Sequence, residues 1–318
     1  LPRLGAVNFH HEHASVALFD LLVAENQLEP EFERYGLDAG HRHFIKELVL
    51  GSKKEADDVP GFLWVGQSPE KRFLYDIVAN KRNGVDVDKL DYFARDCHML
   101  HLSCSFDSQR LMRNSRVISV ARDGEEATEI CFNHKSAFDL YDFFHTRHSL
   151  YKRAYFHKVS SAVDIMVGEA LVLANDHFTV PGKDGKPTKM SDCHKDMHAY
   201  WRITEWIVRY IQHSTIPELA PSRAILERLW KRDLFVCSGE ILLDMEQDGI
   251  RSLKPPAIVS QLQKLKKAIP PCDTLEEAEA EIATMKVIGD DDIFCTMFKL
   301  GYGMKGKNPV SDGTTFFL

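Results

Sequence analysis

Apolar residues recur every three to four positions along most of this chain, which is the spacing of an amphipathic helix. Between Glu12 and Glu25, Val16, Phe19 and Val23 would share one helical face. The stretch from Asp38 to Leu50 repeats the pattern, and the glycine that follows is typical of a helix end. The same spacing predicts further helices over residues 71–81, from about residue 88 onward, and over residues 136–174, 197–212 and 224–230.

Shorter alternating runs replace the helical pattern in two places. Residues Val117–Phe132 alternate around Asp123-Gly124, a pair typical of a tight turn, so we predict a β-hairpin there. Phe178–Met190 contains Pro-Gly, Asp-Gly and Lys-Pro, which predicts a loop or hairpin. After Asp233 the apolar runs shorten. We therefore expect a mainly α domain over residues 1–232 and a mixed α+β lobe over residues 233–318.

Composition narrows the class of protein without pointing to a function. The chain has 318 residues, 44% hydrophobic and 27% charged, which is close to the globular average. Its formal net charge of −7 predicts weak or no binding to nucleic acids. The most apolar early stretch, residues 16–24, is too short to span a bilayer, so no membrane association is expected. Seven scattered cysteines without CxxC spacing favour a reducing compartment.

One polar helical face is the first candidate site. If a helix begins near Asp88, then Tyr92 and Asp96 follow at i+4 and i+8, and Lys89 lies on the same side. This face would offer a carboxylate for a metal, an ammonium for a phosphate, a phenol, and a carboxylate that can accept from a hydroxyl. The alternative is a solvated face whose acids favour the helix dipole. The pattern alone favours that alternative.

A second face follows in the predicted helix over residues 136–174. Arg147, Tyr151, Tyr155 and Lys158 lie at i, i+4, i+8 and i+11. Two cations and two phenols in a row suit a phosphate chain, because the cations supply charge and the hydroxyls supply neutral donors. Tyrosines at this spacing also serve as core residues. The spacing does not decide between the two.

Histidines concentrate in His10–His13, directly before the first predicted helix. The zinc-protease pattern HExxH is absent there. One interpretation is a surface run of histidines. The other is a pair, His11 and Glu12, that performs acid–base chemistry beside a phosphate.

Other familiar motifs are missing or incomplete. Cys193, His194 and His198 offer too few ligands for a convincing metal site. Neither a P-loop nor a GxSxG turn occurs, and Gly301–Lys307 is best interpreted as a glycine-rich loop. These absences disfavour a kinase, a dehydrogenase or a serine hydrolase.

Two long segments carry the most specific pattern: KRNGVDVDKLDYFARDC at Lys81–Cys97 and YDFFHTRHSLYKRAYFHKV at Tyr141–Val159. With shorter segments such as HEHASVALF, KRDLF and LGYGMKGKNPV, they resemble the animal SAM-and-HD-domain deoxynucleoside triphosphate triphosphohydrolases over essentially the whole chain. The resemblance implies a helical HD-domain fold, present here in part, followed by a smaller α+β C-terminal lobe. It also implies metal-dependent hydrolysis of deoxynucleoside triphosphates (dNTPs) to deoxynucleoside and inorganic triphosphate, which controls dNTP pools.

The same resemblance implies roles for the candidate residues. Asp88 would be a ligand of a divalent metal, which could be Zn, Fe, Mg or Mn. His11, with Glu12 beside it, would be the catalytic histidine, and Asp96 would accept a hydrogen bond from the sugar. The positions that bind the triphosphate and the sugar correspond to Lys89, Tyr92, Asp96, Arg147, Tyr151, Tyr155 and Lys158.

This sequence also departs from the family pattern. None of its 15 histidines precedes an aspartate, so the His-Asp dipeptide of the metal site is missing. We expect that dipeptide and the first metal-binding histidine to lie upstream of Leu1. Tyr151 stands where the family has His, and Phe156 where it has Gln, which puts contacts to the base or sugar in doubt.

The resemblance further implies activation by GTP and then by a dNTP at subunit interfaces, with a homo-oligomer that grows from dimer to tetramer. Four residues match the activator positions: Arg110, Lys135, Arg232 and Leu234. Asn114, Asn133 and Val236 replace a Phe, an Arg and a Lys, which weakens this expectation. A nuclear location, with the cytoplasm as the alternative, and a role in antiviral defence complete what the family implies.

Two other functions remain open. One is a non-catalytic, nucleotide-binding or oligomerising paralogue, which the missing His-Asp pair supports. The other is a binder of single-stranded nucleic acid, for which Lys264, Lys266 and Lys267 are the basis. The acidic net charge argues against strong binding of that kind.

Overall fold

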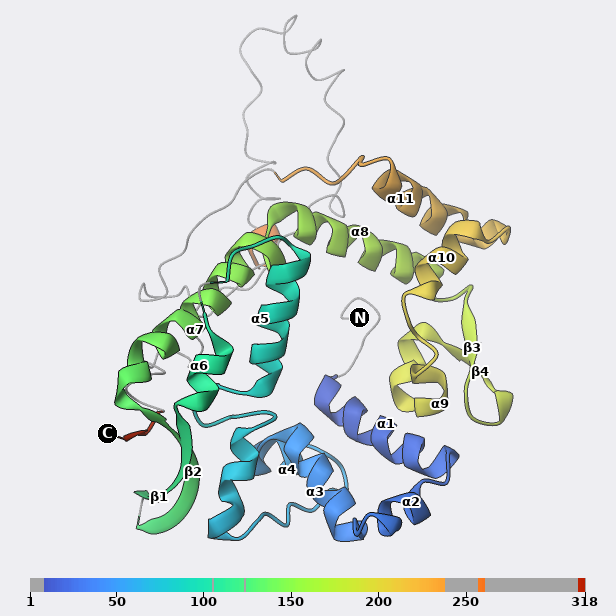
Figure 1. The fold of residues 1–318 in the computed structure, drawn as a ribbon. Helices are drawn as coiled ribbons and strands as arrows, with labels where there is room; N and C mark the ends of the chain where they lie inside the picture. The colour runs from blue at the N-terminus through green and yellow to red at the C-terminus, as the bar shows by residue number, and fades with distance from the viewer. Residues whose placement is uncertain (1–8, 105, 123, 238–256, 261–313, 318) are drawn as a thin grey trace, which may run out of the picture. The chain divides into compact units, whose positions relative to one another are not determined.

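The computed structural model describes residues 9–104, 106–122, 124–237, 257–260 and 314–317. Helices dominate the described residues, which confirms the expected mainly α fold (Figure 1). Their bounds are α1 (His11–Glu25), α2 (Glu29–Arg34), α3 (Ala39–Leu50), α4 (Lys53–Asp57), α5 (Val87–Met99), α6 (Ser108–Arg113), α7 (Ala137–Leu150), α8 (Lys158–Ala174), α9 (Met197–Tyr200), α10 (Trp206–His213) and α11 (Ala220–Trp230). None of the described helices is long and apolar enough to cross a membrane.

Two small sheets accompany the helices. The predicted hairpin is confirmed, since β1 (Ser115–Arg122) and β2 (Glu125–Asn133) pair antiparallel, with Gly124 at φ +84° in the turn between them. β5 (Phe316–Phe317) adds a parallel strand to β2, where Phe316 lies opposite Phe132. The second expected hairpin is also present, as β3 (Thr179–Pro181) and β4 (Pro187–Lys189).

Helix ends follow the sequence signals where these are strong. Asp38 caps α3 by accepting from the backbone N–H of His41 at 3.0 Å. Gly51 ends the same helix in the left-handed conformation, at φ +75°. A side chain at this position would also meet the backbone of Ala79, because an added Cβ would lie 2.6 Å from its carbonyl oxygen. Glycine is the residue that accepts both the positive φ and the close approach of the Ala79 backbone.

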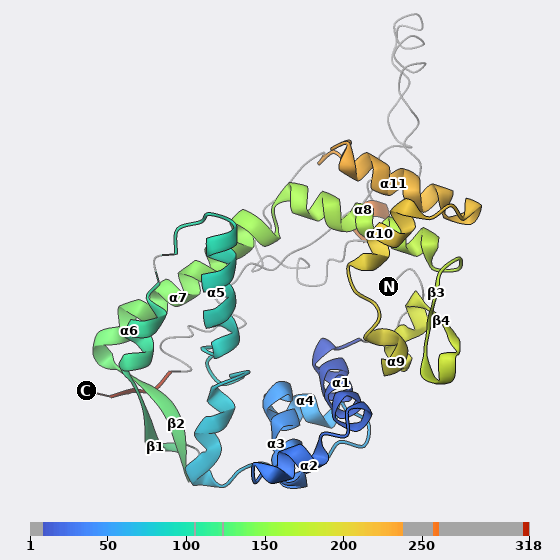
Figure 2. The same ribbon diagram turned by 45° about the vertical axis from the view of Figure 1, so that its right-hand side comes forward.

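Packing of α5 against α7 and β2 forms the core that matters most for the site. Phe93 of α5, Phe106 of the following loop, and Phe143 and Phe144 of α7 are all at least 91% buried and contact one another edge-on or tilted. Figure 2 shows α5 and α7 side by side, as Figure 1 does. This core fixes the polar faces of the two helices relative to each other.

A second core joins α8, α10, α11 and the β3–β4 hairpin. Ala170, Ile211 and Leu226 are almost completely buried there. Ser222 of α11 donates to the backbone oxygen of Ala170 at 2.7 Å, which ties α11 to α8. A third, smaller cluster packs Val16 of α1 against α3 and α4.

Three predicted helices were wrong in part. Residues 71–81 form a 3-10 helix, Pro69–Asp76, followed by turns, since the Asn-rich loop before α5 needs its own hydrogen bonds. The stretch 136–174 is not continuous, because α7 widens into a π-helical turn at Tyr151–Tyr155 and the chain is extended at His157, the N-cap of α8. The stretch 197–212 divides into α9 and α10.

The apolar side chains of the last of these stretches are therefore only partly buried. α10 buries Ile207 and Ile211. Trp201, Trp206 and Tyr210 remain 52%, 42% and 41% exposed. Because the helix restarts at Trp206, Trp201 falls out of phase with the residues behind it.

Contacts along the chain divide it into two compact units. The first contains residues 1–234 together with 300–318, and the second contains residues 235–299. Nearly all of the second unit lies outside the described residues, as do Gly301–Lys307 and the three lysines near residue 265. The expected division into 1–232 and 233–318, and the α+β character of the second part, stay predictions.

Candidate functional site

A buried network of asparagines shapes the loop that leads into α5. The side chain of Asn80 donates to Asn83 Oδ1 at 2.7 Å and to the backbone oxygen of Val85 at 3.1 Å. Asn83 Oδ1 in turn accepts from the backbone N–H of Val85 at 3.0 Å. Both asparagines are at least 96% buried. These bonds give hydrogen-bond partners to buried backbone groups that would otherwise be unpaired, and they fix where α5 begins.

Asp86 is the N-cap of α5 and the partner of Lys89. Its carboxylate accepts from the backbone N–H of Lys89 at 3.2 Å and from that of Asn80 at 3.1 Å. The Lys89 ammonium lies 2.9 and 3.1 Å from the two Asp86 oxygens. Lys89, a candidate phosphate ligand, is thus held by a residue that the sequence analysis did not single out. An Asp directly before a helix, three residues ahead of a Lys, was the signal that could have found it.

Replacing Asp86 by alanine is expected to lower the free energy of unfolding by about 2–3 kcal/mol, because it removes the cap of α5 and orphans a buried N–H. Urea unfolding followed by circular dichroism measures this change. Asp91→Ala is the matched control on the same helix, since Asp91 is exposed and its ion pair with Arg95 lies at the surface. Equal losses in the two variants would contradict the role assigned to Asp86.

Residues of the two predicted faces come together around Tyr92. Tyr92 and Tyr155 have ring centroids 6.3 Å apart, and Tyr155 packs edge-on against Tyr151 at 4.9 Å. The Arg147 guanidinium carbon lies 4.5 Å from the centroid of the Tyr151 ring. We call Tyr92, Arg147, Tyr151 and Tyr155 the tyrosine cluster. It spans α5, α7 and the π-helical turn, a feature that often occurs at functional sites.

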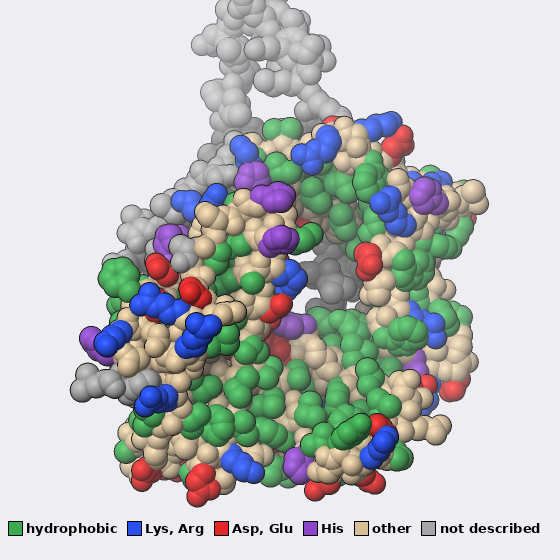
Figure 3. Space-filling view, in the orientation of Figure 1, with side chains coloured by type: hydrophobic (Ala, Val, Ile, Leu, Met, Phe, Trp, Pro, Cys, Tyr) green, Lys and Arg blue, Asp and Glu red, His purple; other side chains and the backbone are tan. Residues whose placement is uncertain are grey.

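The two walls also interact electrostatically at Tyr92. Burial raises the pKa of the Tyr92 phenol above its ordinary value, the Arg147 guanidinium opposes that rise, and Tyr151 and Asp88 add to it. Tyr92 therefore remains a neutral hydrogen-bond donor over the whole physiological range. Figure 3 shows acidic, basic and histidine side chains gathered along the edge of α5.

Asp96 and Tyr155 form a direct hydrogen bond between α5 and the π-helical turn, in which the phenol donates to the carboxylate. Burial and this bond raise the pKa of Tyr155. Arg95 lies 3.3 Å from the other Asp96 oxygen. The Asp96 carboxylate is thereby oriented, and only about a quarter of its side chain is exposed. A hydroxyl that donates to it would lie beside the tyrosine cluster.

Lys158 does not lie on the helical face that its spacing from Arg147 predicted. The break at Phe156 and His157 places it in the first turn of α8, where its side chain is exposed. The backbone N–H of Phe156 bonds to the oxygen of Tyr151 at 2.8 Å, and Ser160 Oγ bonds to the oxygen of Ala154 at 3.0 Å. The predicted single face of Arg147, Tyr151, Tyr155 and Lys158 therefore holds for the first three residues only.

His11 and Glu12 begin α1. His11 is exposed and lies 3.3 Å from Glu12, and Glu12 approaches the Lys81 ammonium at 3.9 Å. Among the described contacts, none joins His11 to Asp88 or to the tyrosine cluster. The structure thus places the His-Glu pair beside Lys81, and the catalytic role of His11 rests on the resemblance.

The candidate site offers one carboxylate as a metal ligand, that of Asp88. Asp88 follows the N-cap of α5, and within the described ranges no three His, Cys, Asp or Glu side chains are grouped so that they could hold a metal ion. About three protein ligands are needed to hold and orient a catalytic metal. The described residues therefore do not fit a complete metal centre. Cys193 is a buried residue of the core around α8 and α10.

The residues that match activator positions are only partly brought together. Arg110 of α6 lies 3.4 Å from Asp139 in the first turn of α7. Lys135 lies directly before α7, where its backbone N–H bonds to Asn133 at 3.0 Å. Arg232 and Leu234 follow α11, with Arg232 at φ +59°.

The mainly α structure, with polar faces of α5 and α7 meeting over one aromatic cluster, is consistent with the HD-domain fold that the resemblance implies. An HD domain-containing protein of Acanthamoeba polyphaga mimivirus is 26% identical over 205 residues, which is 64% of this chain and 36% of that protein. No protein-family model matches the chain.

More narrowly, the chain is related over its whole length to animal SAM-and-HD-domain proteins, which confirms the resemblance. It is 36% identical over 326 residues to deoxynucleoside triphosphate triphosphohydrolase SAMHD1 of Gallus gallus, covering 100% of this chain and 49% of that protein. It is 34% identical to the Homo sapiens protein of the same name, covering 98% of this chain and 47% of the relative. The chain thus spans about half the length of the curated relatives it matches.

Proposed function

We propose that this chain is the part of a dNTP triphosphohydrolase that binds the triphosphate and the deoxyribose. The observation that supports this most directly is that Arg147, Tyr92, Tyr155 and Asp96 come together where α5, α7 and the π-helical turn meet. The names of the relatives support hydrolysis of dNTPs, and they favour it over a non-catalytic paralogue.

Each side chain has a task that its chemistry suits. The Arg147 guanidinium and the Lys89 ammonium would neutralise the triphosphate, with Lys158 joining from α8. Tyr92 would donate a neutral hydrogen bond to a phosphate oxygen. Because Asp86 already pairs with Lys89, the substrate would share this ammonium with Asp86.

The sugar would be recognised on the other side of the cluster. Asp96 would accept from the 3′-hydroxyl, and Tyr155 holds that carboxylate in place. Tyr151 stacks under Arg147 and orients the guanidinium. Hydrolysis adds water to the α-phosphorus and returns a proton to the 5′-oxygen of the deoxynucleoside, so that inorganic triphosphate leaves intact. In this proposal His11 moves that proton, beside Glu12.

The remaining features are proposed from the family resemblance set out in the sequence analysis. A divalent metal is part of the proposal, yet the described residues supply Asp88 as its one ligand, so no step is assigned to it here. GTP and dNTP activators, with Arg110, Lys135, Arg232 and Leu234 as their contacts, and assembly from dimer to tetramer belong to the same proposal. So do weak or absent binding to nucleic acid, a nuclear or alternatively cytoplasmic location, and a role in antiviral defence.

Product analysis tests the proposed reaction. The purified chain is incubated with dGTP, GTP and Mg²⁺ or Mn²⁺, and the products are separated by ion-exchange chromatography. Deoxyguanosine and inorganic triphosphate in equal amounts are the expected products, whereas phosphate or pyrophosphate would contradict the proposal. Bound metal is measured in the same sample. If the chain binds dGTP but releases nothing, the binding part of the proposal stands and the catalytic part fails for this chain alone.

A further inference from the structure

Two thiols meet where α5 ends. Cys97 lies in the last turn of α5, and Cys104 lies in the loop that follows. The backbone N–H of Leu102 bonds to the Cys97 oxygen at 2.9 Å, and His101 is left-handed at φ +53°, so the chain turns back directly after the helix. The Cys97 thiol donates a hydrogen bond to the Cys104 sulfur. The turn thus brings together two cysteines that are separate in the sequence.

The core holds both thiols in this contact. Cys97 itself belongs to the phenylalanine core between α5 and α7. The Cys104 thiol donates to the backbone oxygen of Phe106 at 3.7 Å. Phe106 packs in the same core, with its ring centroid 5.3 Å from that of Phe143. Because both ends of the loop are tied to one core, the fold itself keeps the two sulfurs close.

The two thiols differ in their access to solvent. Cys97 is 95% buried, whereas Cys104 is exposed. Burial raises the pKa of the Cys97 thiol to about 11, and the neighbouring Cys104 adds to this rise. A buried, protonated thiol reacts slowly with solutes. Cys104 is therefore the sulfur of this pair that a dissolved oxidant reaches first.

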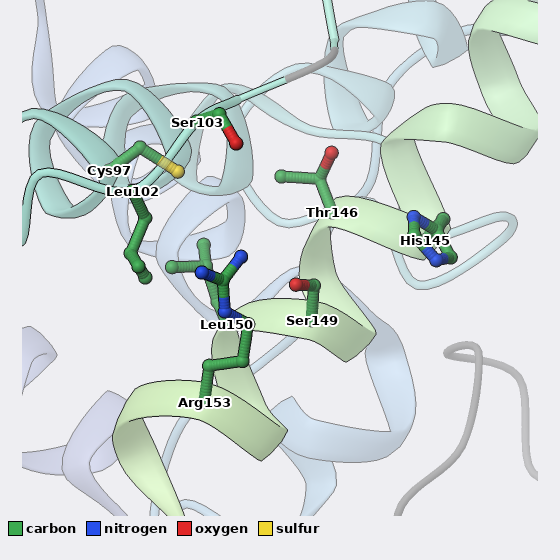
Figure 4. A pocket seen from close by; sticks show the side chains of 8 residues that line it. All are labelled: Cys97, Leu102, Ser103, His145, Thr146, Ser149, Leu150 and Arg153. Carbon is green, nitrogen blue, oxygen red and sulfur yellow. The ribbon is translucent and has the colours of Figure 1, made fainter.

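The surroundings of Cys97 let the sulfurs approach further. A disulfide requires them to come within about 2 Å of each other. A pocket of about 140 Å³ adjoins Cys97, so its side chain has room to rotate. Figure 4 shows this side chain pointing from α5 toward Ser103, the residue before Cys104. Arg153 lines the same pocket, and its positive charge favours the thiolate form of Cys97.

We propose that Cys97 and Cys104 are a redox-sensitive pair that hydrogen peroxide converts into a reversible disulfide within the chain. The Cys104 thiolate attacks peroxide, the O–O bond breaks, hydroxide leaves, and a sulfenic acid remains. The Cys97 thiol then loses its proton and attacks the Cys104 sulfur. The S–S bond forms as the S–O bond breaks, and the hydroxide leaves with a proton as water.

The reaction balances as two thiols and one peroxide giving one disulfide and two water molecules. A dithiol reductant reverses it. Transient disulfides of this kind occur in reducing compartments, which the scattered cysteines favour. The inference rests on the thiol pair and is independent of the proposed hydrolysis.

Peptide mapping of the full chain tests the proposal. The folded chain is treated with a small excess of hydrogen peroxide, its remaining thiols are blocked with N-ethylmaleimide in denaturant, and it is digested with trypsin. Cleavage after Arg95 and Arg110 releases both cysteines in one peptide, residues 96–110, which contains no other cysteine. This peptide should be lighter by two hydrogens and carry no N-ethylmaleimide. Dithiothreitol should restore both thiols.

Serine variants test the order of the steps. In Cys104→Ser, Cys97 should stay a thiol under the same treatment, because it is buried. In Cys97→Ser, Cys104 should stop at the sulfenic acid, which dimedone traps. Cys193→Ser is the matched control: it removes a buried thiol from the other core and should form the disulfide as the parent does.

Two results would overturn the proposal. One is a parent peptide that keeps both thiols, or that gains only oxygen, after exposure to peroxide. The other is a disulfide that joins two copies of the peptide from different chains, which its doubled mass would reveal.

Discussion

A variant in which methionine replaces Arg147 is expected to bind dGTP about 100-fold more weakly than the unchanged chain, a loss of about 3 kcal/mol. The guanidinium is a charged donor positioned over the face of Tyr151 and close enough to Tyr92 to affect its pKa. Methionine keeps the apolar stem that packs on the tyrosine ring but removes charge and donors. Isothermal titration of dGTP into the chain measures the change, whether or not the chain turns dGTP over.

Two further variants show what kind of contact Arg147 makes. Arg147→Lys keeps the charge without the planar fork and should lie between the parent and Arg147→Met. Lys152→Met removes one positive charge from the exposed side of the same turn and should change the affinity by less than about threefold, because an exposed charge is screened. An unchanged affinity in Arg147→Met would mean that Arg147 serves only to pack on Tyr151.

The sequence predicted much of this site because helical spacing alone places side chains on a common face. Tyr92 and Asp96 on α5 do line a wall next to the one formed by Arg147 of α7 and by Tyr151 and Tyr155 of the π-helical turn. Spacing could not predict that the two walls meet, since their meeting depends on the phenylalanine core between α5 and α7. The resemblance supplied that link.

Other features depend on contacts that a periodic pattern does not contain. The π-helical turn and the break before Lys158 arise where the chain must aim Tyr155 at Asp96 while starting a new helix capped by His157. The bond between Asp86 and Lys89 requires that α5 begin one residue before Asp88, and the asparagine network behind it decides that start. The position of His11 relative to the tyrosine cluster likewise depends on tertiary packing, which the spacing of residues within α1 does not predict.

Replacing Phe143 by alanine is expected to lower the free energy of unfolding by about 3–5 kcal/mol, the usual cost of deleting a fully buried aromatic ring. Phe143 is completely buried and touches Phe93, Phe106 and Phe144, with ring centroids 4.9, 5.3 and 5.0 Å away. Denaturant unfolding measures the loss. Phe138→Ala is the control on the same helix, because Phe138 is 80% exposed and should cost less than about 0.5 kcal/mol.

The same variant tests whether the core positions the site. Phe143 lies one helical turn before Arg147, so a cavity at Phe143 lets α7 shift relative to α5 and moves the guanidinium away from Tyr92. In conditions where Phe143→Ala remains folded by circular dichroism, dGTP should bind more weakly than to the parent, while Phe143→Leu, which fills most of the space, should recover part of both stability and affinity. If Phe143→Ala loses stability yet binds dGTP as the parent does, then the two walls are held together by the Tyr155–Asp96 bond and not by the phenylalanine core.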